Sequence, residues 1–532
     1  MAGLEAAKPG QEYTDEQLRL CLLLLNAYGV LRMSHINDQP IQSWGSPLGT
    51  SRRPDGDTLE QYLNTIIRCD KAKDDGSSVA VLPGQVRPGG LIDTAQLNSL
   101  VCWAQAGLLT DDIWYFDGHT VEYTGQEEIG KTKHGTKQTS VKAVKRFTLF
   151  NNINALTEYF PTSVSYAEAM RQMVAKVNAV LPPQYRIGKL AFDKEGWDAD
   201  LLQWLENEQD IIPITWVKAT KANRRLLVSV PKSEFVSVEE EKMTVGKSEH
   251  KARVTQVADT QVTFPDLGSQ RVVVLETEAK TRLGIYTTAL HAKDGALDNK
   301  RAMTTPRLID TMRFKQRIEN DFKVETNEMN SDAIPTHKVH EVQQTEAYDA
   351  PQARRQLANA EKRLPKYAAQ EEQHRRLLDE EQIDKHEFNV LNTRTQRLRR
   401  QTKHQDKRLK TELDSVKMNA EGQTVRSYTT HVLDMRKLTL LNLFKTHTLV
   451  VLHILAQQLG LDGAGPARLR RQFLPFGDRV EFDHVRRIVT VYAQRFPRAQ
   501  TQQAYERLCA LQGDLPVALE RNGISYRVRF SW

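Results

Sequence analysis

Cysteine is rare in this chain: there are four among 532 residues, and no two of them form a CxxC pair. Structural zinc sites need closely spaced cysteine and histidine ligands, and small secreted domains stabilised by disulfides are dense in cysteine. The scarcity of cysteine therefore argues against a zinc site and against a disulfide framework. It favours a protein that works in a reducing cytoplasm.

Long apolar runs are missing as well. No window approaches the roughly 18 uninterrupted apolar residues of a membrane-spanning helix. The most apolar stretch, from Thr439 to Gly460, contains Lys445 and two histidines, so it predicts a buried helix. The first residues also lack the basic-then-apolar pattern of a secretory signal. We therefore expect no membrane partner.

Basic residues exceed acidic residues only modestly, 74 Lys and Arg against 67 Asp and Glu, for a net charge of +7. This balance is compatible with a nucleic-acid partner without requiring one. The excess is concentrated in the segment "TRTQRLRRQTKHQDKRLK" (393–410), which holds eight basic residues and one aspartate. Two interpretations stay open, a surface that contacts DNA phosphates and the charged face of a coiled coil. The predicted DNA-contacting residues are Arg394, Arg397, Arg399, Arg400, Lys403, Lys407 and Arg408.

Capped helical patterns dominate residues 1–105. Residues 14–35 and 57–69 each start with a capping signal and continue with helical spacing of apolar residues, and 93–107 is a third such segment. The first two could form a DNA-reading helix-turn-helix, although the polar connection between them is long for that motif. The alternative is a plain helical subdomain.

Strand and helix patterns alternate over residues 106–224. A mixed sheet flanked by helices fits this order, so the predicted fold class is α/β. The expected strands span 112–118, 141–152, 155–164, 187–196 and 210–219, and the expected helices span 165–182 and 198–208.

Four further regions follow this predicted core. Residues 225–300 show period-two patterns with β-branched residues, which predict a β-rich insertion. Residues 301–345 return to the core with a helix over 305–326, where Pro306 suits the first turn. Residues 346–425 are charged and predict an antiparallel pair of long helices, kinked or bounded by Pro365. Residues 426–532 are expected to be mostly helical, with a strand-like end.

Three acids have positions that suggest chemistry. Asp117 follows the apolar "WYF" and Asp193 follows "LAF", so both should lie where predicted strands end, and Glu319 belongs to the later helix. Functional side chains of α/β sheets gather at strand ends. Carboxylate oxygens suit Mg²⁺, and two such ions can assist phosphoryl transfer. Each acid also has an ordinary interpretation, because Asp-Gly pairs form turns and Lys323 could pair with Glu319 on a helix surface.

Residues near these acids also have two possible roles each. His119 could contact a phosphate or the attacking group, or it could be a hydrogen-bonded histidine at the sheet edge. Arg317 and Lys323 could bind DNA phosphates or form solvated ion pairs. Trp197 could stack on an extruded base, although a core tryptophan is the favoured interpretation.

Three segments resemble a group of bacterial insertion-sequence transposases of the DDE class. They are "YFDGHTVEYTG" (115–125), "LAFDKEGW" (190–197) and "RFKQRIENDFK" (313–323), and the likeness extends from about residue 58 to the end of the chain. The resemblance implies a ribonuclease-H-like catalytic domain that uses two Mg²⁺ or Mn²⁺ ions. It implies that Asp117, Asp193 and Glu319 hold the metal.

The hypothesis that follows is a DNA transposase that cleaves strands at transposon ends and joins the 3′-hydroxyl to target DNA. Its partners would be double-stranded DNA, both the inverted repeats and the target, and a second copy in a homodimer. It would work in the bacterial cytoplasm, at the nucleoid. Three alternatives remain: a catalytically silent DNA-binding descendant, a nuclease of the same fold that does not join strands, and a helical scaffold whose acids are turn residues.

Overall fold

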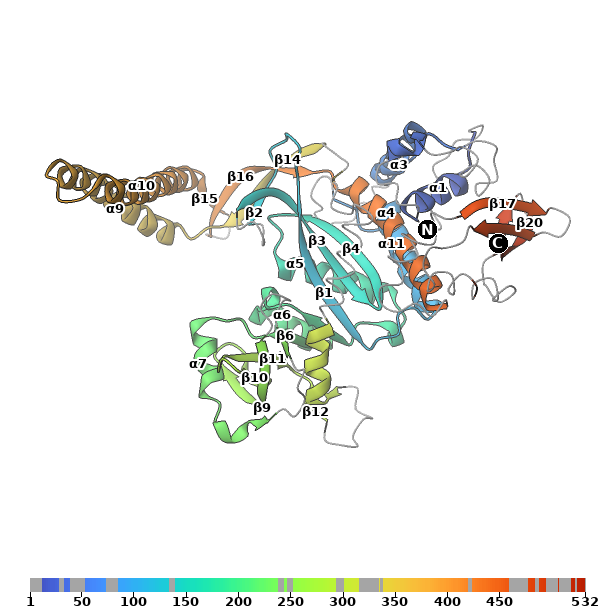
Figure 1. Cartoon of the computed structure of the whole chain (residues 1–532), viewed down its shortest axis with the longest axis horizontal. Coiled ribbons are helices and arrows are strands. Elements are labelled where there is room, and N and C mark those ends of the chain that lie inside the picture. The colour runs from blue at the N-terminus through green and yellow to red at the C-terminus, as the bar shows by residue number, and fades with distance from the viewer. Residues whose placement is uncertain are drawn as a thin grey trace. The chain divides into compact units, whose positions relative to one another are not determined.

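The computed structural model describes most of the chain as two compact units, residues 1–338 with 433–532, and residues 339–432 (Figure 1). The described residues are 12–27, 33–38, 53–72, 85–133, 139–237, 244–245, 252–292, 301–314, 334, 338–419, 423–458, 477–483, 488–493, 506, 518–521 and 524–531.

A mixed β-sheet forms the centre of the first unit. Five of its strands are β1 (Ile113–Glu122), β3 (Ser140–Asn151), β4 (Ile153–Pro161), β5 (Lys189–Phe192) and β6 (Ile212–Trp216). They lie in the order β4-β3-β1-β5-β6. The strand β3 is antiparallel to both β1 and β4, whereas β5 is parallel to β1 and β6 is parallel to β5. The short β2 (Lys131–Lys133) pairs with β3. The mixed α/β fold expected from the sequence is therefore confirmed.

The β-rich segment continues this same sheet. Its strands are β7 (Val236–Ser237), β8 (Thr244–Val245), β9 (Ala252–Phe264), β10 (Gly268–Thr277) and β11 (Arg282–Thr287). The sheet continues from β6 through β11 and β10 to β9, and the β6–β11 pairing is antiparallel. Beyond it, β12 (Leu290–His291) pairs with β13 (Ala302–Met303). The period-two segments thus extend the core sheet at the β6 edge.

Helices cover both faces of the sheet, which explains why its strands are apolar on both sides. On one face, Trp114 and Phe116 belong to a core that includes residues of α4 and α5. On the other face, Ile113 and Tyr115 pack with the helical residues 305–314 (Figure 1). The helices and short helical turns of this part are α4 (Leu91–Gln105), α5 (Tyr166–Val180), η2 (Pro183–Tyr185), η3 (Lys194–Gly196), α6 (Ala199–Gln203), η4 (Trp204–Glu208), α7 (Lys221–Ser229) and η5 (Lys232–Glu234).

A helical cluster joins distant parts of the chain. It contains α1 (Asp15–Ala27), η1 (Met33–Asp38), α3 (Gly56–Ala72) and α11 (Arg436–Gln458). Leu440, Leu443 and Phe444 of α11 share one apolar core with residues of the three N-terminal elements. The apolar stretch after Thr439 is therefore a buried helix, as expected. Within the described residues, no helix has the length and apolar character needed to cross a bilayer.

The second unit contains the predicted helical hairpin, formed by α9 (Ala350–Asp379) and α10 (Lys385–Asp414). Ala353 and Ala360 of α9 and Thr395, Thr402 and Leu409 of α10 are buried at multiples of seven residues, the spacing of a coiled-coil seam. Pro365 lies inside α9 on its exposed surface, so it neither bounds nor ends the helix. A three-stranded sheet accompanies the hairpin, with β14 (Val339–Ala347), β16 (Thr424–Leu433) and β15 (Val416–Met418) in that order.

The C-terminal region differs from the expectation. Besides α11, its described residues form a four-stranded sheet in the order β17-β18-β20-β19. The strands are β17 (Gly477–Asp483), β18 (Ile488–Ala493), β19 (Ala518–Arg521) and β20 (Ile524–Ser531). The prediction of a mostly helical region over 426–532 is therefore wrong for these residues. The physical reason lies in segments such as "IVTVYA", whose β-branched and aromatic residues favour a pleated strand.

Candidate active site at the ends of two parallel strands

Two aspartates lie beside each other at the same edge of two adjacent strands. The parallel pairing of β1 and β5 ends with Phe116 opposite Phe192. Asp117 is the next residue of β1 and Asp193 directly follows the end of β5. Neighbouring strands are about 4.8 Å apart. The sheet therefore places the backbones of the two acids side by side.

Neither aspartate is enclosed in the apolar core. Both side chains are partly exposed. Side chains of a strand alternate between its faces, so Asp117 shares the face of Tyr115, on the side of the helical residues 305–314. One Asp193 oxygen accepts a hydrogen bond from the Lys194 backbone N–H at 2.7 Å, which starts η3.

The strand containing the first acid is longer than the sequence predicted. We expected a strand over 112–118 that ends near Asp117, with Asp-Gly as a turn in the ordinary interpretation. The structure corrects both points, because β1 continues to Glu122 and Gly118 pairs with Phe147 of β3. Asp117 thus projects from the middle of a paired strand, which fixes its backbone firmly.

Tyr166, the first residue of α5, lies close to both acids. Its hydroxyl donates a hydrogen bond to the carbonyl of Phe116 at 3.2 Å. Burial is the main cause that raises the pKa of Tyr166 well above its usual value, and the Asp117 and Asp193 carboxylates raise it further. A hydrogen bond from the Asp193 backbone acts in the opposite direction. The phenol group of Tyr166 therefore lies beside the backbone that leads to Asp117.

A helical segment runs along β1 on the face of the two acids. Near the start of this segment, Arg307 forms an ion pair with Asp112, just before β1. At residue 314, the Phe314 ring lies 5.2 Å from the Tyr115 ring, centroid to centroid. Residues 305–314 therefore advance in the same direction as β1, toward Asp117.

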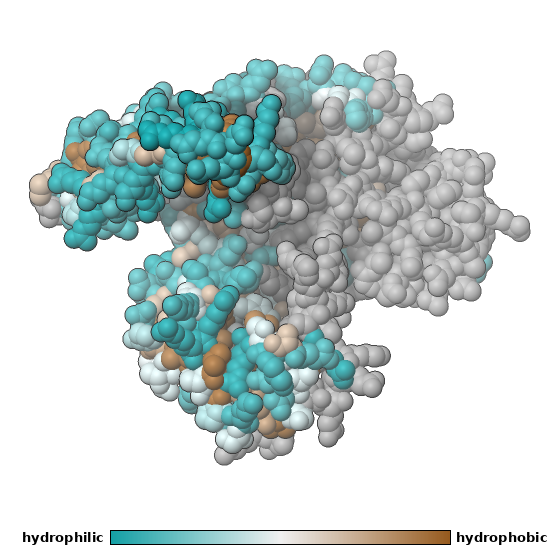
Figure 2. Space-filling model, turned by 60° about the vertical axis from the view of Figure 1, so that its left-hand side comes forward, coloured by the Kyte–Doolittle hydropathy of each residue, from teal (hydrophilic) through white to brown (hydrophobic). Residues whose placement is uncertain are grey.

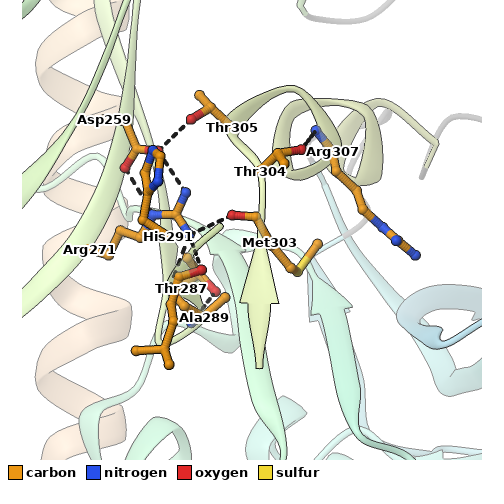
Figure 3. A network of polar contacts seen from close by, with 10 residues as sticks. Asp259, Arg271, Thr287, Ala289, His291, Met303, Thr304, Thr305 and Arg307 are labelled. Carbon is orange, nitrogen blue, oxygen red and sulfur yellow. Dashed lines mark hydrogen bonds and ion pairs between the residues drawn. The ribbon is translucent and has the colours of Figure 1, made fainter. Parts of the chain in front are cut away.

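The beginning of this helical segment is fixed by a polar network (Figure 3). Arg271 of β10, whose side chain is 5% exposed, binds both oxygens of Asp259 at 2.9 and 2.6 Å. The same guanidinium donates to the carbonyls of Ala289, Leu290 and Met303. Thr305 donates to Asp259 as well, at 2.5 Å. Strands β9 and β10 thus anchor the start of the helical segment 305–314. The sequence did not predict this role of the β-rich segment.

The structure shows where some of the predicted site residues lie. His119 lies two residues beyond Asp117 on the same face of β1, opposite Arg146. Trp197 packs edge-on against Phe264 and Tyr286 at 5.3 and 5.4 Å, so the core interpretation is confirmed. Glu319, Arg317 and Lys323 lie outside the described residues. Among the residues that are described, no three acids, histidines or cysteines gather into a metal-binding group.

The basic residues predicted on α10 are all exposed. Two of them form ion pairs, Arg399 with Glu371 at 2.6 Å and Arg408 with Glu412 at 3.5 Å. The other five have no ion-pair partner within the described part of the chain: Arg394, Arg397, Arg400, Lys403 and Lys407.

Comparisons with known proteins find a distant structural likeness. The sequence matches no family model and no curated protein. Among solved structures, a chain of the piggyBac transposase synaptic complex with hairpin DNA matches at 10% identity and a TM-score of 0.28. The match covers 59% of this chain and 68% of the other. Similarity at this level carries no argument about activity.

Proposed function

We propose that this protein is a DDE-type DNA transposase, a metal-dependent enzyme that cleaves strands at transposon ends and transfers them to target DNA. The observation that carries the proposal is the placement of Asp117 and Asp193 directly after the last in-register pair of the adjacent parallel strands β1 and β5. That placement is what the motifs "YFDGH" and "LAFDKEGW" require if both acids bind one pair of cations.

The order of the strands supports a ribonuclease-H-like core. Three antiparallel strands, β1, β3 and β4, come first in the chain, and the parallel β5 and β6 then join the free edge of β1. Helices lie on both faces, as such a core requires. We therefore propose that this mixed α/β fold is ribonuclease-H-like, with the two acids at the end of the β1–β5 pairing.

Glu319 is the proposed third acid. It follows Phe314 by five residues, and Phe314 contacts Tyr115, two residues before Asp117. A chain spans at most about 3.6 Å per residue, so five residues cover up to about 18 Å, far more than two residues of β1. Chain length therefore permits the Glu319 carboxylate to reach the two aspartates.

The donor set fits Mg²⁺ or Mn²⁺. Asp117 and Asp193 are partly exposed and present carboxylate oxygens, the ligand type that these hard cations prefer. When bound, two cations would stabilise the attacking and the leaving oxygens of an in-line displacement. His119, on the same face as Asp117, would orient a DNA phosphate beside the acids.

The proposed partner is double-stranded DNA, at the transposon ends and at the target. The exposed basic residues of α10 would contact its phosphates and supply affinity that does not depend on sequence. The two ends must be brought together before strand transfer, so we propose that the protein acts as a homodimer, in the bacterial cytoplasm at the nucleoid.

The test uses duplex DNA taken from both flanks of the gene, with Mg²⁺ or Mn²⁺. We expect the wild-type protein to nick the duplex and to join the product to a target plasmid. Asp117→Asn should lower the rate by more than about 100-fold, the upper cost of losing an outer-shell group at a metal site. Asp200→Asn, an exposed carboxylate in the first turn of α6, is the matched control and should retain the rate.

The alternatives give different products in the same assay. A nuclease of the same fold would nick without joining, and a silent DNA-binding descendant would shift the duplex without nicking it. If the protein is a scaffold, Asp117→Asn and Asp200→Asn would behave alike, and calorimetric titration with MnCl₂ would detect no binding. Any of these three results would refute the transposase proposal.

A further inference from the structure

We propose that Tyr166 is a positioning residue that fixes the separation between Asp117 and Asp193. The inference rests on the proposed function, because it assigns Tyr166 a role at the same metal site. Tyr166 lies outside the three motifs that resemble the transposase group, and no other feature of the sequence singles it out.

The hydroxyl of Tyr166 lies at the end of the paired part of β1 and β5. The last pair there is Phe116 opposite Phe192. Buried backbone groups at the end of such a pairing still need hydrogen-bond partners, because an unpaired one costs free energy. The Tyr166 hydroxyl donates to the Phe116 carbonyl at 3.2 Å, and the Tyr166 ring lies against Gly196 in the turn that Asp193 starts. Tyr166 thus links the residue before the first acid to the turn that starts at the second acid.

The ring that presents this hydroxyl is held on several sides. It packs edge-on against Phe116 and Phe147, with centroid distances of 5.0 and 5.5 Å. A β-carbon placed on Gly196 would lie 2.8 Å from the Tyr166 ring, and one placed on Gly118 would lie 3.6 Å from it. The ring therefore fills the space that the glycines of both aspartate motifs leave open.

The helix that carries Tyr166 is itself anchored. The Ser165 side chain caps α5 by accepting from the Glu168 N–H, and Met170 and Met173 are fully buried. Further along, Lys176 forms ion pairs with Asp93 and Glu158 at 3.0 and 2.7 Å. Because α5 is held at these points, the Tyr166 side chain at its start is held in place beside β1 and η3.

Positioning of this kind affects metal binding more than folding. Metal sites need their ligands within about 0.5 Å of the working geometry, and removal of an outer-shell group costs roughly 10–100-fold in metal affinity. The ring packing supplies most of what Tyr166 contributes to the core. Loss of the hydroxyl alone should therefore loosen the two carboxylates and leave the fold in place.

The experiment compares full-length Tyr166→Phe with wild type by calorimetric titration of MnCl₂ and by metal-free thermal denaturation. We expect Mn²⁺ affinity to fall roughly 10–100-fold while the metal-free melting temperature changes by less than about 4 °C. Tyr185→Phe, another partly buried tyrosine of the same core, is the matched control and should keep wild-type affinity. Incorporation of 3-fluorotyrosine at position 166 retains the hydroxyl and should restore binding.

The outcomes separate this inference from the proposed function. If Asp117→Asn abolishes Mn²⁺ binding and Tyr166→Phe binds like wild type, the positioning role is refuted and the metal site stands. If Asp117→Asn and Asp193→Asn both bind like wild type, the metal site itself is refuted. A fall in affinity with 3-fluorotyrosine equal to that with phenylalanine would also overturn the positioning role, because the hydroxyl would then be irrelevant.

Discussion

At the scale of single residues, neighbouring aromatic rings leave no space for a side chain at the two glycines of the aspartate motifs, Gly118 and Gly196. A β-carbon on Gly118 would lie 2.7 Å from the Phe147 ring, and one on Gly196 would lie 2.6 Å from the Phe192 ring. Contacts below 3.0 Å force a neighbour to move, and these neighbours are aromatic rings in a packed core. The motifs "DG" and "DKEG" therefore combine an acid with a residue small enough for the rings that support it.

Gly196→Ala should destabilise the protein by about 1–3 kcal/mol, the usual cost of overpacking a core. Gly188→Ala is the matched control, because a β-carbon there would meet nothing within 4 Å. It should be neutral, or stabilise by up to about 1 kcal/mol through the loss of backbone freedom in the unfolded chain. Urea denaturation measures both, and equal effects of the two substitutions would contradict the spatial explanation.

At the scale of elements, the basic residues of α10 divide into those that form ion pairs and those that form none within the described part of the chain. Two acids of α9 form ion pairs with basic residues of α10, Glu371 with Arg399 and Glu361 with Lys410. Arg397, Arg400, Lys403 and Lys407 recur every three or four residues, and in an α-helix that spacing places them on one stripe away from the buried seam. Figure 2 shows the hydrophilic surface of the hairpin. The unpaired stripe is therefore the part of α10 suited to phosphates.

Arg397→Gln with Arg400→Gln should weaken binding to a random DNA duplex. Each phosphate contact contributes about −0.9 to the slope of log K against log salt, so the slope should become shallower by about 2. Fluorescence anisotropy across a salt series measures it. The matched control, Arg399→Gln with Arg408→Gln, removes the same charge from residues that already form ion pairs, and it should change the slope by less than about 1. Equal slopes for the two double variants would contradict this division.

At the scale of the whole molecule, α11 connects the C-terminal half to the N-terminal helices. His447 lies against α4, with its Nε2 2.8 Å from the Ser99 hydroxyl and its ring 5.0 Å from that of Trp103. Burial lowers the pKa of His447 to about 3 from an ordinary 6.5. The imidazole is therefore neutral in the folded protein at any physiological pH.

This burial makes stability depend on pH. Below pH 6.5 the unfolded chain binds a proton at His447 that the folded chain does not bind, so stability falls as the pH drops from 6.5 toward 3. Between pH 7.5 and 5.5 the loss should be about 1.4 kcal/mol for this group. His447→Gln should remove that part of the pH dependence in urea denaturation, whereas the exposed His386→Gln should not. A pH dependence unchanged by His447→Gln would show that α11 is not seated on α4 in this way.

The sequence alone determined the elements whose signal is local. Apolar runs placed the strands that contain Asp117 and Asp193, and charged helical periodicity placed the α9–α10 hairpin, because both patterns depend on neighbours a few residues apart. The strand-like end of the chain matches β20, whereas β17, β18 and β19 and the length of β1 escaped prediction. Short apolar runs do not distinguish a strand from a helix, and pairing to β3 decides where β1 ends.

Only the tertiary structure decided which residues meet. The register of β1 with β5 brings together two acids that are 76 positions apart in the sequence, 117 and 193. The hydrogen bond of Tyr166 to the Phe116 carbonyl and the contacts of Asp259 with Arg271 and Thr305 depend on packing across the sheet. Such contacts leave no periodic trace in the sequence, because they are set by how helices and strands pack in three dimensions and not by spacing along the chain.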